Sequence, residues 1–129
     1  MGNRRDFMLG AGAVAFLSPD MAKAVAAAGP VASFNVLYPN HAGARFDMAY
    51  YRATHIPLVE KVMRPASTLL IEGVAAGGNP APYAMIAHFG FPSAEALQAA
   101  LAGPDMALLR DDLTKFTDIK PVIMMGKSG

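Results

Sequence analysis

The order of hydrophobic patterns between residues 33 and 125 restricts this chain to very few folds. Alternation of apolar residues at every second position predicts half-buried strands at 33–38 and 83–91, and short apolar runs predict strands at 68–74 and 119–125. Apolar residues spaced three and four apart predict helices at 47–63, 93–102 and 105–116. The order is strand, helix, strand, strand, helix pair, strand. Residues 126–129 are expected to be a frayed tail.

This order predicts an α+β fold of the ferredoxin-like βαββαβ type, with an antiparallel sheet and the helices on one face. The other face of the sheet then needs cover, and in so small a chain a partner's sheet is a natural cover. We therefore expect a homodimer. The functional site should lie between the sheet and the helices, or between the two sheets.

The first 28 residues have the features of an export signal. An apolar run at 7–17 is too short to span a bilayer as a helix, and small residues near Lys23 offer cleavage sites. The residues that lead into this apolar run resemble the twin-arginine motif. They are Asn3, Arg4, Arg5, Asp6, Phe7 and Met8. An ordinary buried helix fits less well, because Pro19, Asp20 and Gly29-Pro30 interrupt the run. We predict a twin-arginine signal peptide at 1–28, a mature domain at 29–129 and a periplasmic location.

Charge and composition exclude several classes of function. Cleavage after residue 28 would remove three basic and two acidic residues, so the net charge would fall from +1 to zero. A neutral domain lacks the excess of positive charge that attracts nucleic acid or an anionic membrane. No stable membrane association is expected after cleavage. The absence of cysteine excludes disulfides, thiolate metal sites and thiol catalysis. The glycine-containing loop at 77–82 lacks the lysine of a nucleotide-binding loop.

The segment 45–58 carries most of the chemically useful side chains. Asp47 is a candidate N-cap, and Phe46 and Tyr51 occupy the positions of a hydrophobic staple around it. A spacing of four continues from Asp47 through Tyr51 and His55, so these side chains share one helix face. Pro57 cannot donate a hydrogen bond to the carbonyl of residue 53, so the helix should bend or restart near His55.

Two interpretations of His55 follow from this pattern. In the first, its imidazole faces a pocket as an acid, a base or a hydrogen-bond partner. In the second, it is a half-buried histidine bonded to the carbonyl that Pro57 leaves free, and Tyr51 only fills the core. The spacing alone favours the second.

A set of residues in the first half of the domain resembles the signature of the EthD family, which is named for a protein encoded with an ether-degrading oxygenase system. These residues are Tyr38, Pro39, Asn40, Gly43, Ala44, Arg45, Phe46, Asp47, Tyr50, Tyr51, His55, Pro57 and Leu58. The resemblance extends from about Ser33 to the C-terminus. It implies a dimeric α/β barrel, in which two sheets face each other, and it favours the interpretation in which His55 lines a cavity.

The resemblance and the spacing together suggest an enzyme that acts on a small apolar organic molecule, of oxidoreductase or oxygenase-associated type. His55 would transfer a proton, Tyr51 would bind a substrate oxygen, and Asp47 would orient the site. Tyr50, Phe34 and His88 would contact the substrate. No cofactor and no metal are expected, and a cofactor-independent monooxygenase-like reaction is the form that such an enzyme would take.

Two other functions stay open. A periplasmic binding or carrier protein would hold the same kind of ligand without changing it. A haem or metal protein would use His55 or His88, but these histidines lack a recognised ligand spacing. His88 shares a strand face with Ile86, and the pattern does not say which layer that face meets. Asp111 and Asp112 are interpreted as a solvated pair, because neighbouring helix positions point apart.

Overall fold

Four antiparallel strands form one sheet in the computed structural model, which describes residues 31–128. The predicted signal peptide lies outside the described residues. The strands are β1 (Ala32–Pro39), β2 (Ser67–Glu72), β3 (Tyr83–Phe91) and β4 (Val122–Lys127). Their spatial order is β2-β3-β1-β4, so the first and third strands occupy the centre. The predicted α+β, ferredoxin-like fold is confirmed.

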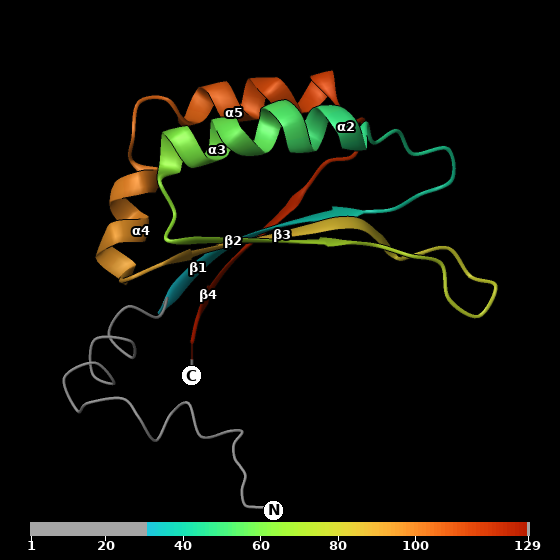
Figure 1. The fold of residues 1–129 in the computed structure, drawn as a ribbon, viewed down its shortest axis with the longest axis horizontal. Helices are drawn as coiled ribbons and strands as arrows, with labels where there is room; N and C mark the ends of the chain where they lie inside the picture. The colour runs from blue at the N-terminus through green and yellow to red at the C-terminus, as the bar shows by residue number, and fades with distance from the viewer. Residues whose placement is uncertain (1–30, 129) are drawn as a thin grey trace, which may run out of the picture.

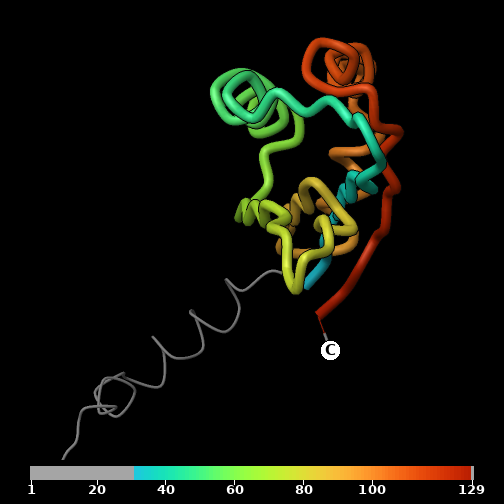
Figure 2. Tube along the Cα trace, turned by 90° about the vertical axis from the view of Figure 1, so that its right-hand side faces the viewer, coloured from blue at the N-terminus to red at the C-terminus, as the bar shows by residue number. Residues whose placement is uncertain are grey.

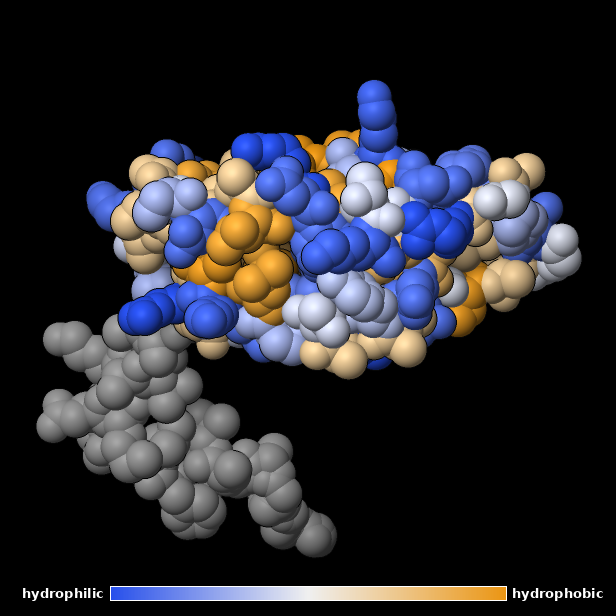
Figure 3. All heavy atoms as spheres, turned by 90° about the horizontal axis from the view of Figure 1, so that it is seen from above, coloured by the Kyte–Doolittle hydropathy of each residue, from blue (hydrophilic) through white to orange (hydrophobic). Residues whose placement is uncertain are grey.

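The helices all lie on one face of this sheet (Figures 1 and 2). They are α2 (Met48–Tyr50), the π-helical turn η3 (Tyr51–His55), α3 (Ile56–Met63), α4 (Ala94–Leu101), α5 (Met106–Asp112) and the 3₁₀ turn η4 (Leu113–Lys115). The helix side of the molecule is mostly hydrophilic, with apolar residues gathered in a patch to the left of its centre (Figure 3). Within the described part of the chain, no helix combines the length and the hydrophobicity that crossing a membrane requires.

Local sequence signals explain where the helices begin and change. Asp47 accepts a hydrogen bond from the backbone N–H of Tyr50, and Ser93 accepts one from that of Ala96, so both predicted N-caps are confirmed. The expected disturbance near Pro57 takes the form of the π-helical turn, which ends at His55, and a regular helix restarts at the next residue. Single π-helical turns of this kind often occur at functional sites.

The core lies between the helices and the inner face of the sheet. On β1 this face carries Phe34, Val36 and Tyr38, which lie opposite Phe89, Ala87 and Met85 of β3. Phe116, just after η4, is fully buried and contacts the rings of Tyr38, Phe46, Tyr50, Tyr51 and His55. The end of η4 therefore packs against the residues around α2 and η3. This contact brings two distant parts of the sequence together.

The outer face of the sheet is apolar around a small polar centre. Its exposed apolar side chains include Leu69 and Ile71 of β2 and Val122 and Met124 of β4. Asn35 bonds to His88 at 2.7 Å in the centre, and it also donates to Ser33 and to the carbonyl of residue 124. No helix of the described residues covers this face (Figure 2).

The two outer strands differ from their predicted bounds. The second strand ends at Glu72 rather than at residue 74. Gly73 follows it at a position where a Cβ would overlap the carbonyl oxygen of Tyr83. The last strand starts at Val122, after Pro121, and the expectation of a frayed tail from residue 126 is wrong. Gly126 pairs with Ser33, and a Cβ there would lie 2.7 Å from the serine Oγ, so a larger residue would displace the serine hydroxyl.

Candidate active site

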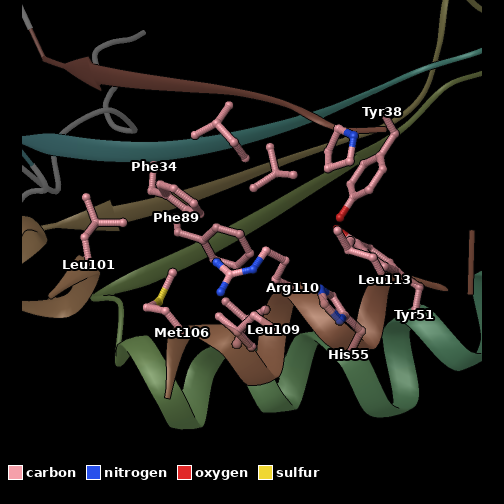
Figure 4. Close-up of a pocket in the computed structure, with 14 residues that line it drawn as sticks. Phe34, Tyr38, Tyr51, His55, Phe89, Leu101, Met106, Leu109, Arg110 and Leu113 are labelled. Atoms are coloured by element: carbon pink, nitrogen blue, oxygen red, sulfur yellow. The ribbon is translucent and has the colours of Figure 1, made fainter. Parts of the chain in front are cut away.

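A cavity of about 340 Å³ lies between the helices and the sheet, near the lower end of the range of about 300–1,000 Å³ that is usual for small-molecule sites. Its wall is mainly aromatic and aliphatic. The lining residues are Phe34, Val36, Tyr38, Tyr51, His55, Val59, Phe89, Leu101, Met106, Leu109, Arg110, Leu113, Pro121 and Ile123 (Figure 4). Such a wall suits a small, largely apolar organic molecule.

His55 is held by a carboxylate from the other helical region. Its Nδ1 lies 2.9 Å from Oδ2 of Asp112, and the two residues are only 5% and 6% exposed. An ionised carboxylate can only accept, so we assign the proton of the neutral ring to Nδ1. Nε2 then carries a free lone pair, on a ring that lines the cavity.

The surroundings of the pair keep the acid ionised and the base neutral. Burial lowers the pKa of His55, and the hydrogen bond and charge of Asp112 offset this only in part. Burial pushes the pKa of Asp112 upward, but the hydrogen bonds from His55 and Tyr50 and the charges of His55 and Lys115 outweigh it and hold the pKa below its usual value. At neutral pH His55 is therefore a neutral base beside a carboxylate.

Tyr50 holds the other oxygen of the Asp112 carboxylate. Its hydroxyl donates to Oδ1 of Asp112 at 2.7 Å, and this hydrogen bond is the main reason why the pKa of Tyr50 is raised. The Nζ of Lys115 lies 3.9 Å from the same oxygen. Both oxygens of Asp112 are thus engaged, which fixes the carboxylate and, through it, the plane of the imidazole.

Two phenol groups lie near the histidine at the same end of the cavity. The hydroxyl of Tyr51 is buried and has no hydrogen-bond partner among the described residues. The hydroxyl of Tyr38 faces it (Figure 4), close enough to affect its ionisation but outside hydrogen-bonding geometry. Burial is the main cause that raises the pKa of both phenols, so each stays protonated as a donor. A buried donor without a partner is costly, and a ligand oxygen would satisfy it.

Comparison with known proteins identifies the family of this chain. A family model described as the EthD domain matches residues 42–120, a segment that contains both His55 and Asp112. The chain belongs to the EthD family. None of the curated proteins compared with the sequence matches it.

Two solved structures resemble this EthD-family chain. An EthD-like protein from Ralstonia eutropha JMP134 is 32% identical, with a TM-score of 0.69, over 77% of this chain and 92% of that one. An ethyl tert-butyl ether (EthD) family protein from Bacillus halodurans C-125 is 18% identical, with a TM-score of 0.62, over 77% of this chain and 99% of that one. The second likeness concerns the fold alone.

The EthD-family fold brings some of the predicted site residues together and separates others. Phe34, Tyr51 and His55 line the cavity, as the site prediction requires. Tyr50 does not line it and acts on the pair through Asp112. Asp47 is occupied as the helix N-cap. His88 lies on the outer face of the sheet, bonded to Asn35, so it cannot share a ligand with His55 inside one chain.

Sequence reasoning missed the residue that completes the pair. The interpretation of Asp112 as solvated is wrong, because this residue is buried, whereas its neighbour Asp111 is exposed. The usable signal is spacing, because Asp112 lies three residues after buried Leu109 and four before buried Phe116. The interpretation in which His55 bonds to a free backbone carbonyl is also wrong, since its Nδ1 bonds to Asp112.

The histidines give no support to a metal site. Among residues 31–128 no cluster of three or more histidine, cysteine, aspartate or glutamate side chains could hold a metal ion. His55 and His88 lie on opposite faces of the sheet, and the remaining histidine, His41, is in the exposed loop after β1.

Proposed function

We propose that this EthD-family protein binds a small, largely apolar organic molecule in the cavity and acts on it by proton transfer, in oxygenase-associated chemistry. One observation carries the proposal: the buried pair of His55 and Asp112 leaves a free imidazole nitrogen on an apolar cavity wall. A neutral histidine oriented by a carboxylate is the arrangement that general-base catalysis requires.

In the proposed step, Nε2 of His55 accepts a proton from an acidic C–H or O–H group of the ligand. The negative charge that develops on the ligand oxygen is stabilised by a hydrogen bond from the Tyr51 hydroxyl, which has no other partner among the described residues. Asp112 stabilises the imidazolium that forms. An electron-rich anion is also the form that reacts with dioxygen without a cofactor, so the step fits an oxygenase-type reaction.

Proton transfer can be tested without knowing the natural substrate. We expect the protein to accelerate deuterium exchange at the acidic C–H positions of 2-tetralone, a small apolar ketone, as followed by proton NMR in D₂O. His55→Gln should reduce this acceleration by at least about hundredfold. The rate should rise with pH below 6.5 and level off near neutrality, because the base must be unprotonated and its pKa is lowered from 6.5.

His41→Gln is the matched control, because this histidine is exposed in the loop after β1 and should leave the exchange rate unchanged. If His55→Gln exchanged 2-tetralone as fast as the wild type, the proposed base would be wrong. Retention of bound ketone without accelerated exchange would instead favour the second candidate, a binding or carrier protein, for which the unpaired Tyr51 hydroxyl serves equally well.

We also propose that the protein is a homodimer that joins through the outer faces of its sheets, as in a dimeric α/β barrel. The support is the group of exposed apolar side chains on this face, of which Leu69 and Met124 are each 55% exposed. They occupy opposite edges of the sheet, on either side of the polar centre formed by Asn35 and His88. Exposed apolar side chains gathered on one face of a sheet are typical of an interaction site.

Export is a further part of the proposal. The twin-arginine motif in residues 1–28 predicts that the protein is carried to the periplasm in folded form. This location suits a domain without cysteine, since an oxidising compartment would not alter it by disulfide formation.

A further inference from the structure

One charged side chain enters the apolar cavity. Arg110 of α5 is exposed to solvent and also lines the cavity wall. Its guanidinium points toward the end formed by Phe89 and Met106, whereas Tyr51 and His55 lie at the opposite end (Figure 4). The cavity therefore has two polar regions, separated by apolar wall.

The surroundings of the Arg110 guanidinium offer it no partner within the described part of the chain. Among residues 31–128 it makes no hydrogen bond and no ion pair. Other arginines do have partners: Arg45 donates to the carbonyl of Thr114 at 2.8 Å, and Arg52 pairs with Glu72 at 3.2 Å. No aspartate or glutamate of the described segment lines the cavity. An arginine with five donors beside apolar wall is well suited to bind an acceptor group that enters with a ligand.

The negative charge of Asp112 lies outside the cavity wall that Arg110 lines. Asp112 does not line the cavity, and both of its oxygens are engaged by His55 and Tyr50. A ligand anion entering the cavity would thus meet the positive charge of Arg110 in an otherwise uncharged wall. A planar carboxylate matches the fork of a guanidinium with two parallel hydrogen bonds.

We infer that the ligand is a small organic carboxylate whose acid group pairs with Arg110. Its apolar body lies against Phe34 and Phe89, and a second oxygen, of a hydroxyl or carbonyl group, reaches the Tyr51 hydroxyl beside His55. This inference rests on the cavity being the ligand site, as proposed above, and it narrows the substrate class from apolar molecules to apolar acids with a distal oxygen.

The test compares an acid with its uncharged isostere. Calorimetric titration with 4-hydroxyphenylacetate and 4-hydroxyphenylacetamide should show at least about tenfold tighter binding of the acid, because charge-assisted hydrogen bonds are roughly twice as strong as neutral ones. Arg110→Gln should abolish this preference, and Arg110→Lys should keep most of it. Lys61→Gln, which removes an equal charge from the far side of α3, should change nothing.

Equal affinity for acid and amide would overturn the inference, as would an acid preference that survives in Arg110→Gln. Binding of neither compound by a protein that still exchanges 2-tetralone through His55 would overturn it too, while leaving the proposed function intact. Conversely, an acid preference that requires Arg110, found together with ketone exchange that ignores His55→Gln, would support the inference and reject the proposed base.

Discussion

Asp112→Ala is expected to lower the free energy of unfolding by about 3 kcal/mol, the cost typical of breaking one side of a buried, hydrogen-bonded pair. The substitution leaves Nδ1 of His55 and the hydroxyl of Tyr50 without their acceptor. It also removes the interaction that offsets the effect of burial on the imidazole, so the pKa of His55 should fall further. Ketone exchange should decrease together with stability, since the ring is no longer held in one orientation.

Urea denaturation of the neighbouring variants separates this role from a general effect of lost charge. Asp111→Ala removes the same charge one residue earlier, from an exposed position, and should change stability by no more than about 0.5 kcal/mol. Asp112→Asn keeps the shape of the side chain and allows the pair to be tested if the alanine variant fails to fold. Equal midpoints for Asp111→Ala and Asp112→Ala would contradict a structural role for the pair.

The second large effect concerns the outer face of the sheet. Met124→Lys should weaken the proposed dimer by at least about hundredfold, because an unpaired charge would be buried among apolar side chains. Met124 is 55% exposed and faces away from the helices, next to Asn35, so the fold of the single chain should tolerate lysine. Sedimentation velocity over a range of protein concentrations measures the change.

Leu108→Lys is the matched control, because this leucine of α5 is 51% exposed and belongs to the helix layer. It should leave the association state unchanged. A wild-type protein that sediments as a monomer at every concentration would exclude the dimer. So would a Met124→Lys variant that associates as strongly as the wild type.

The fold could be predicted because its signals are local. Capping by Asp47 and Ser93, alternation along the strands and the break at Pro57 each involve residues within a few positions of one another. The bounds of the outer strands depended instead on contacts across the sheet. Pairing of Gly126 with Ser33 joins distant parts of the sequence, and a glycine followed by a polar tail gives no local sign of it.

Only one of the two segments that form the site could be predicted from the sequence. Tyr51 and His55 belong to one helical region, so helical spacing and family resemblance identified them together. Asp112 lies 57 residues after His55, and local spacing gives no sign that α5 packs beside the π-helical turn. For His88, alternation fixed the neighbours on the same strand face, but only the sheet order shows that this face points away from the helices.

His55 should be a neutral base that carries its proton on Nδ1 and its lone pair on Nε2, on a ring that lines the cavity. Nitrogen NMR of the protein with ¹⁵N-labelled histidine, titrated between pH 4 and 8, tests it directly. We predict the tautomer protonated at Nδ1 at neutral pH and a pKa below 6.5, with the tautomer preference lost in Asp112→Ala. A His55 ring that is protonated at neutral pH, or that carries its proton on Nε2, would contradict the account.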